Sequence, residues 1–362
     1  MRSTALEING LHGGKRPTIQ DVANALGMHK STVSVALSGK GTLSSDTRER
    51  ILSVARDMGY VPNPIAQRLA IGYRNPAVCI FSGALDVGLA TEKILLIQRE
   101  LSKESLEVPI YTCSEGTVEG SISQAAQVRQ ICRQRPRAII CAGHMLEEAV
   151  FEELSDYQGS GGSVITYDNE VPLECDQVIF DREYNAYLAA QHLLERGHKK
   201  IGLGLSSKID WLTSSDSYRQ AARRKGFERA VVEYNGIAKD EWIFQHSTYE
   251  KGGEELAKAF IEMSDRPTGL CIVNDYVALA FMVTVMRAGI KIPDDLSIVG
   301  HDNQPITKYC PVPLTSATQP AEAIAKKVVE MLLERLNDNS LPPRKISITS
   351  ELVERNSVRS LV

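Results

Sequence analysis

Two short amphipathic patterns lie close together near the start of the chain. Apolar residues recur at helical spacing over about 18–26 and again over about 30–37. Thr18 is a suitable N-cap for the first pattern, and Asp21, three residues later, makes a weak capping box. Gly27, between the two patterns, suits the left-handed conformation that ends many helices. The pattern predicts two short helices joined by a glycine turn.

The second predicted helix has an apolar inner face and a polar outer face. Its outward positions carry a cation and three hydroxyls, at Lys30, Ser31, Thr32 and Ser34. A third amphipathic stretch follows from Ser44 to about Met58. A short helix that hides its apolar face and displays such side chains fits the major groove of DNA. The pattern favours a helix-turn-helix, and the alternative is an ordinary small helical hairpin.

After Pro76, short apolar runs alternate with helical stretches. Strands are expected at 78–81, 108–111, 138–141, 163–167, 177–180, 200–205, 242–244, 269–273 and 296–300. Repeated strand–helix units demand a parallel sheet with helices on both faces. The chain holds two such series, so we expect two doubly wound lobes with a cleft between them. Ligands of such sheets bind beyond the carboxyl ends of the strands.

Composition excludes several classes of protein. The chain has 362 residues, 43% of them hydrophobic, which is ample for two or three packed domains. No run of 18 apolar residues predicts a membrane span, and the first 15 residues lack a secretory pattern. The seven cysteines are odd in number and scattered, which favours reduced core residues of a cytoplasmic protein. No Cys/His spacing suits zinc, so neither a metal nor a cofactor is expected.

Charge is distributed unevenly along the chain. Residues 1–74 hold ten Lys and Arg against five Asp and Glu, a net charge of +5. The remaining residues carry a net charge of −9. A basic head on an acidic body is typical of a protein that contacts phosphates at one end only.

Several separate motifs occur along the chain in a consistent order. The first group is Asp21-Val22-Ala23, Thr32-Val33-Ser34, Thr47-Arg48, Gly59-Tyr60-x-Pro62-Asn63 and Ala66-x-x-Leu69. The second group is His192-Leu193-Leu194-x-x-Gly197-His198-x-x-Ile201, Arg223-x-x-Gly226-Phe227, Asn274-Asp275, Ile292-Pro293-Asp294-Asp295-Leu296-Ser297-Ile298-Val299-Gly300-x-Asp302, Leu314-Thr315 and Gln319-Pro320. The first group resembles the DNA-binding head of the LacI/GalR family, and the second resembles that family's periplasmic-binding-protein-like core.

The resemblance implies an all-α helix-turn-helix head joined by a hinge helix to a two-lobed α/β core. The expected divisions are a loose tail over 1–16, the head over 17–61, a hinge helix and linker over 62–75, and the core over 76–362. Within the core, the first lobe is expected at 76–168 plus 303–337, and the second at 169–302 plus 338–362.

The resemblance also implies a function. Such a protein is a transcriptional regulator, expected here to be a repressor, that binds pseudo-palindromic double-stranded operator DNA as a homodimer, with a tetramer left open. The implied DNA-contacting residues are Thr18, His29, Lys30, Ser31, Thr32, Ser34, Val35, Asn63, Ala66, Gln67, Arg68 and Leu69. Lys30 and Ser31 are expected to read bases, and Val35 to touch a thymine methyl. Leu69 is expected to wedge open a base step in the minor groove, against the alternative of helix packing.

A small polar effector is implied for the cleft between the lobes. The implied residues are Asp168, Phe180, Asp181, Arg223, Ser247, Asn274 and Asp302. Asp168 is expected to end the strand that leaves the first lobe, Phe180 to end the first strand of the second lobe, and Asp302 to lie at a crossover. Acids, an amide and an arginine suit a sugar or sugar derivative, because hydroxyls both donate and accept. The alternative roles are hinge hydrogen bonds and helix caps. Ser247 stands where many family members carry an aromatic residue.

Two other classes compete with this interpretation. A soluble solute-binding protein would use the same cleft but would not carry residues 17–72. An enzyme would need a catalytic motif, and Gly202-x-Gly204 falls far short of a dinucleotide fingerprint. The sequence holds no Gly-x-Ser-x-Gly elbow and no P-loop, and no catalytic residue is expected.

Overall fold

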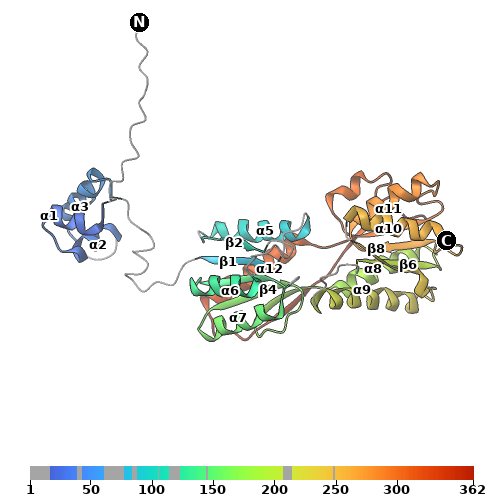
Figure 1. The fold of residues 1–362 in the computed structure, drawn as a ribbon, viewed down its shortest axis with the longest axis horizontal. Helices are drawn as coiled ribbons and strands as arrows, with labels where there is room; N and C mark the ends of the chain where they lie inside the picture. Colours follow the sequence, from blue (N-terminus) through green and yellow to red (C-terminus); the bar gives the residue numbers. More distant parts are fainter. Residues whose placement is uncertain are drawn as a thin grey trace, which may run out of the picture. The chain divides into compact units, whose positions relative to one another are not determined.

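The computed structural model describes residues 17–38, 43–60, 77–83, 88–104, 106–113, 123–143, 146–206, 214–247 and 249–362. The chain divides into two compact units, Met1–Arg74 and Asn75–Val362 (Figure 1). The tail expected at 1–16 and the hinge segment expected at 62–75 lie outside the described residues.

The described residues of the first unit form three helices: α1 (Ile19–Leu26), α2 (Lys30–Ser38) and α3 (Ser45–Asp57). The capping box is complete, because Asp21 N donates to Thr18 Oγ1 and Thr18 N donates to Asp21 Oδ2. Gly27 has φ 61°, so the predicted left-handed stop is confirmed. The three helices bury one small core: Val22, Ala23, Val33, Ala36, Ile51 and Ala55.

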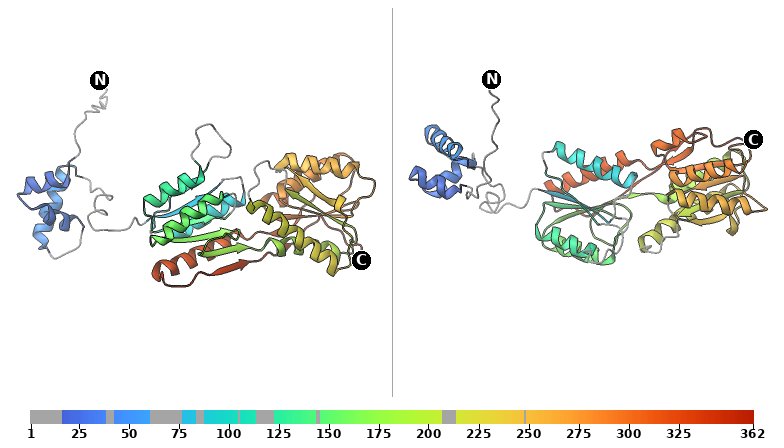
Figure 2. Two further views of the ribbon diagram at one scale, coloured as in Figure 1. Left: turned by 60° about the horizontal axis from the view of Figure 1, so that its bottom comes forward. Right: turned by 45° about the horizontal axis from the view of Figure 1, so that its top comes forward.

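The first lobe of the second unit is built on a parallel sheet in the order β11-β5-β4-β3-β1-β2. Its strands are β1 (Val78–Ser82), β2 (Ile110–Thr112), β3 (Ala138–Ala142), β4 (Ser163–Asp168), β5 (Asp176–Phe180) and β11 (Lys345–Ile348). Its helices are α5 (Leu89–Lys103), α6 (Gln124–Arg133), α7 (Glu148–Gly159) and α12 (Ala321–Asn337). Successive strand residues point to opposite faces, so Ile80 and Ile140 pack with α5 and α12, while Phe81 packs with α6 and α7. Both faces are therefore covered, and α12 lies beside α5 although the two are far apart in sequence (Figures 1 and 2).

The second lobe repeats this plan with the order β12-β10-β9-β8-β6-β7. Its strands are β6 (Ile201–Ser206), β7 (Ile243–His246), β8 (Gly269–Ile272), β9 (Ser297–Asp302), β10 (Thr315–Thr318) and β12 (Leu352–Val353), of which β12 is antiparallel to β10. Its helices are α8 (Arg182–Glu195), α9 (Ser214–Glu233), α10 (Tyr249–Glu262) and α11 (Asp275–Arg287), with short 3₁₀ turns at Asp240–Trp242 and Pro305–Tyr309. One hydrophobic core of this lobe includes residues of α8, and a second core includes residues of α10 and α11. The prediction of two doubly wound sheets is confirmed.

The predicted lobe boundaries are wrong in three segments. Strand β5 pairs with β4 and β11, so 169–180 belongs to the first lobe. Strand β10 pairs with β9, which places 303–318 in the second lobe. Strand β11 returns 338–348 to the first lobe. The membership of a strand depends on its hydrogen-bond partner, and apolar periodicity does not specify that partner.

These corrections also change the positions of three site residues. Phe180 ends the last strand before the chain leaves the first lobe, rather than the first strand of the second lobe. Asp168 ends β4, from which the chain continues to β5 in the same sheet. Asp302 ends β9 and is followed by β10 of the same sheet, so it does not lie at a crossover of the chain. The chain crosses between the lobes after Phe180, Thr318 and Ile348.

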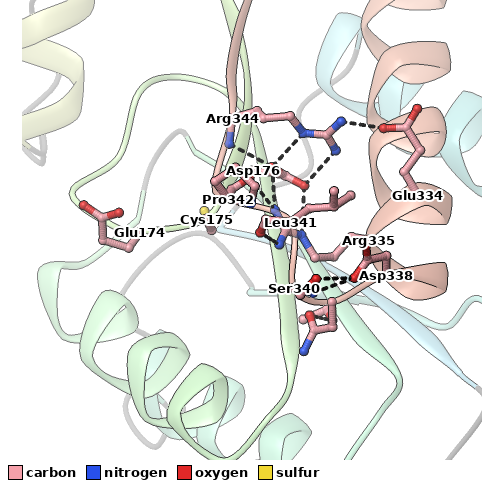
Figure 3. A network of polar contacts seen from close by, with 12 residues as sticks. Glu174, Cys175, Asp176, Glu334, Arg335, Asp338, Ser340, Leu341, Pro342 and Arg344 are labelled. Carbon is pink, nitrogen blue, oxygen red and sulfur yellow. Dashed lines mark hydrogen bonds and ion pairs between the residues drawn. The ribbon is translucent and has the colours of Figure 1, made fainter.

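A buried carboxylate fastens the C-terminal elements to the first sheet. Asp176 begins β5 and is 1% exposed (Figure 3). It accepts hydrogen bonds from Arg335 of α12 at 3.0 and 3.1 Å, and from the Arg344 backbone at 2.9 Å. Burial raises the pKa of Asp176, but the hydrogen bonds from Arg335 and Arg344 bring that pKa below its ordinary value. This cluster ties α12 and the segment that leads into β11 to the start of β5.

All seven cysteines are free, and five of them are buried. Burial raises the pKa of Cys79 to about 12, so its thiol stays protonated at neutral pH. The prediction of reduced core cysteines agrees with this arrangement. Among the described residues, no helix has the length and apolar content needed to span a membrane.

Candidate nucleic-acid interface and interlobe site

The N-terminal end of α2 presents the residues expected to read DNA. His29, Lys30 and Ser31 are exposed, while Thr32 and Ser34 are half-buried. Val33 is fully buried against the head core and fixes the orientation of α2. The exposed set therefore combines a cation, an imidazole and a hydroxyl on a helix held by its opposite face.

His29 is tied to the first turn of α2. Its Nδ1 lies 2.8 Å from Ser31 Oγ, and the Ser31 backbone N–H donates to the same atom at 3.5 Å. The ring thus supplies part of the capping that serine or threonine provides elsewhere. Thr18 is exposed, but its hydroxyl donates to Asp21 at 2.7 Å and belongs to the α1 cap. Val35 is half-buried.

The remaining expected DNA contacts lie outside the described residues. They are the hinge residues Asn63, Ala66, Gln67, Arg68 and Leu69. Their roles stay predictions from the sequence.

Between the lobes, the carboxylate of Asp168 is a buried charge centre. Asp168 Oδ1 lies 2.8 Å from Lys93 Nζ, 3.0 Å from Arg182 and 3.0 Å from Gln319 Nε2. Lys93 and Asp168 belong to the first lobe, Arg182 begins α8 of the second, and Gln319 lies on a crossing segment. Asp168 and Lys93 are 3% and 2% exposed. The cluster therefore joins the two lobes through buried charge-assisted hydrogen bonds.

Arg223 and Asp302, which belong to the second lobe, interact electrostatically with the same cluster. Burial and the neighbouring Arg182 together lower the pKa of Arg223 to about 9, against the opposing effects of Asp302 and Asp168. Burial raises the pKa of Asp302 to about 6 against the stabilising charges of Arg223, Lys93 and Arg182. Three predicted residues, Asp168, Arg223 and Asp302, are therefore brought into one electrostatic group.

A second buried carboxyl, that of Asp275, interacts with Asp302. Asp275 is fully buried and accepts hydrogen bonds from Gln304 N at 2.7 Å and Ser316 Oγ at 2.8 Å. Burial and the neighbouring Asp302 raise its pKa well above the ordinary value. Asp275 thus anchors the β9–β10 connection, on which Asp302 depends for its position.

A cavity of about 570 Å³ opens beside Asp302. Its walls come from both lobes and from the crossing segments, and include Glu92, Asp302, Gln304, Gln319, Glu322 and Glu351. Lys93, Arg182 and Arg223 are not part of its lining. Gln319 belongs both to this lining and to the Asp168 cluster.

Two of the predicted effector residues are helix caps. Asp181 accepts a hydrogen bond from Tyr184 N at 2.8 Å at the start of α8. Asn274, at φ 82°, accepts hydrogen bonds from Tyr276 N and Val277 N at the start of α11. Their polar atoms satisfy helix N-termini, which was the alternative role considered for them.

Two further predicted residues are engaged by the protein itself. Phe180 is 3% exposed, and the Arg182 guanidinium lies 5.3 Å from the centre of its ring. The Ser247 hydroxyl donates to Glu255 at 2.8 Å. Ser247 thus contacts α10 through Glu255.

Sequence reasoning missed Lys93, Arg182 and Gln319. Lys93 occupies the apolar face of α5, among Ala90, Ile94 and Ile97, where a charge is out of pattern. That break in periodicity was the available signal, because buried lysines are almost always paired. Arg182 gave no comparable signal, and Gln319 belongs to the Gln319-Pro320 motif, from which no site role was predicted.

Comparison with known proteins agrees with this architecture. Residues 18–63 match the model "Bacterial regulatory proteins, lacI family", and residues 190–358 match "Periplasmic binding protein-like domain". The HTH-type transcriptional repressor PurR of Photobacterium profundum is 26% identical over 344 residues, covering 95% of this chain and 99% of that protein. The PurR protein of Aliivibrio salmonicida is 27% identical over 345 residues, with the same coverage.

Solved structures share the fold. A lac repressor dimer bound to operator and the anti-inducer ONPF has a TM-score of 0.78 at 21% identity, covering 95% of this chain and 100% of that one. A LacI family regulator from Enterococcus faecium with bound ribose has a TM-score of 0.65 at 21% identity, covering 78% of this chain and 100% of that one. With its capped three-helix head matching one family model and residues 190–358 of its body matching the other, this chain belongs to the lacI family of bacterial regulatory proteins.

Proposed function

We propose that this protein is a cytoplasmic transcriptional repressor that binds a pseudo-palindromic operator as a homodimer. Each head reads one half-site, since two-fold protein symmetry matches two-fold DNA symmetry. A small polar effector, a sugar or sugar derivative, binds between the lobes and changes operator affinity.

The observation that carries the DNA-binding part is the exposed N-terminal end of α2. Lys30 and Ser31 project from a helix whose opposite side, at Val33 and Ala36, is buried. Such a helix enters the major groove by its N-terminal residues. The curated relatives are named repressors, and the lac repressor neighbour was solved as a dimer on its operator.

The effector part is supported by the buried polar group between the lobes. Asp168 and Asp302 offer acceptors at strand ends, and Arg223 offers donors from within α9. Neighbouring structures hold ribose and cellobiose. An effector changes DNA binding only through different affinities for two arrangements of the protein. Contacts that cross the lobes, such as Arg182 to Asp168, are suited to differ between such arrangements.

The first experiment measures binding of the purified chain to duplex DNA from its own upstream region, by fluorescence anisotropy over a salt series. We expect affinity to fall steeply with salt as phosphates release counterions. We expect Lys30→Ala to weaken DNA binding. The matched control is Lys251→Ala, which removes an exposed lysine of the body. Salt-independent binding, or equal affinity for the two variants, would contradict the proposal.

The second experiment tests regulation in cells. A reporter driven by the protein's own promoter should vary across carbon sources with the wild type. With Arg223→Ala it should stay constant, while the purified variant binds promoter DNA as the wild type does. Unchanged regulation by this variant would place the effector elsewhere.

A further inference from the structure

Arg223 is a buried cation without a partner among the described residues. Arg223 is 9% exposed. Its side chain makes no hydrogen bond or ion pair with the described part of the chain. Its Nε is among the buried polar atoms that lack a partner. A buried charge of this kind is costly unless an opposite charge and hydrogen bonds satisfy it.

Among the described residues, the charges near Arg223 do not balance it. Asp168 is already held by Lys93 at 2.8 Å and by Arg182 at 3.0 Å. Asp302 is the other carboxylate in the group, and it forms no ion pair with Arg223. Among the described residues, the three cations Lys93, Arg182 and Arg223 thus face two carboxylates.

Two other residues in or beside this cluster have buried polar atoms without partners. The Nε of Arg182 is unpartnered, and so are both polar atoms of the Asn169 amide, which follows Asp168 and is 2% exposed. A site that needs one negative charge and several hydrogen bonds is matched by a carboxylate or a phosphate. A guanidinium binds either of these groups through two parallel hydrogen bonds.

We propose that the effector carries an anionic group, a carboxylate or a phosphate, that pairs with Arg223 beside Arg182. This inference rests on the proposed function, since it concerns the effector of the same interlobe site. It narrows the ligand class from sugars in general to sugar acids, sugar phosphates and similar small anions. The acidic cavity beside Asp302 does not include these cations in its lining.

A second arginine of the same lobed body provides a matched comparison. Arg335 is also 9% exposed, but it donates two hydrogen bonds to Asp176 at 3.0 and 3.1 Å (Figure 3). A structural arginine is thus paired within the protein, whereas Arg223 is not.

The first test needs no knowledge of the effector. The melting temperatures of the full-length wild type, Arg223→Met and Arg335→Met are compared after exhaustive dialysis. Methionine keeps the apolar stem and removes the charge. We expect Arg223→Met to melt about 3 °C or more above the wild type, and Arg335→Met to melt below it. A lower melting temperature for Arg223→Met would mean that Arg223 is balanced within the protein, and would overturn the inference.

The second test uses anions as probes at constant ionic strength. Inorganic phosphate should raise the melting temperature of the wild type more than that of Arg223→Met, because ligands that bind only the native state stabilise it. Glucose 6-phosphate and gluconate should stabilise the wild type more than glucose does. Equal phosphate shifts in the two proteins, or a preference for glucose, would overturn the inference.

Operator binding is measured on the same preparations to separate the two proposals. If the wild type binds its promoter DNA but is stabilised more by glucose than by the anions, only the proposal of an anionic effector is contradicted. If the wild type shows the Arg223-dependent shift with phosphate but does not bind promoter DNA, only the proposed function is contradicted.

Discussion

The guanidinium of Arg182 lies 3.0 Å from the Asp168 carboxylate and donates a second hydrogen bond to the Asp168 backbone carbonyl at 2.9 Å. Asp168 ends a strand of the first lobe, and Arg182 begins the first helix of the second. The contact therefore spans the first crossing of the chain. Asp168 has φ 87°, a conformation rare for a residue with a Cβ, so the fold holds the carboxylate in place at some backbone cost.

Removal of this carboxylate should destabilise the body. Asp168→Asn leaves Lys93 and Arg182 buried without their anion, so we expect a loss of about 3–5 kcal/mol in the free energy of unfolding. Urea denaturation measures the change. Asp265→Asn is the control, because Asp265 pairs with Lys200 and Lys239 on the surface, where such pairs contribute little. Similar losses in the two variants would contradict the central role of Asp168.

Stability should depend on the pH through Asp302. Its pKa is raised from 3.8 to about 6 by burial, so the native state holds this proton more tightly than the unfolded chain does. The stability contributed by Asp302 therefore falls as the pH rises from about 4 to about 6. Asp302→Asn should be more stable than the wild type at pH 7, by up to about 3 kcal/mol, since one pKa unit corresponds to about 1.4 kcal/mol.

The comparison of Asp302→Asn with the wild type should be repeated at pH 4 by urea denaturation. There the advantage of the variant should largely disappear, because the wild-type carboxyl is then protonated in the native state. A difference that stays constant from pH 4 to pH 7 would show that Asp302 does not titrate in this range.

Two substitutions in α2 should have different effects on DNA binding, one on its salt dependence and the other on its base preference. Lys30→Ala removes an exposed cation, so the slope of log affinity against log salt should fall by about one. Val35→Ala should leave that slope unchanged and relax the preference at one base pair. Anisotropy titrations on operator duplexes that differ at single positions measure both effects. An unchanged base preference in Val35→Ala would place the reading face elsewhere.

The hinge residue Leu69 gives a prediction from sequence alone. Leu69→Ala should weaken binding to the operator by a few kcal/mol and leave nonspecific binding nearly unchanged, since the wedge acts only where a base step opens. Competition against random duplex DNA separates the two. Equal losses on both kinds of DNA would assign Leu69 to helix packing.

The local signals in the head were sufficient for its structure. Thr18, Asp21 and Gly27 set the bounds of α1 through the capping box and the left-handed turn, and these interactions join residues only a few positions apart. The same holds for the alternating strands and helices of the body. Asp181 and Asn274 lie at helix starts, where a carboxylate or amide caps the first turn, so their position at strand ends did not establish an effector role.

The sequence by itself determined the helix-turn-helix and the two doubly wound sheets, because periodicity, caps and motif spacing are local or shared with a family. Only the tertiary structure decided which sheet β5, β10 and β11 join, and that Lys93, Asp168, Arg182 and Gln319 meet between the lobes. Hydrogen-bond partners of strands and the pairing of buried charges are settled between residues far apart in the chain. The order of residues alone does not specify these long-range contacts.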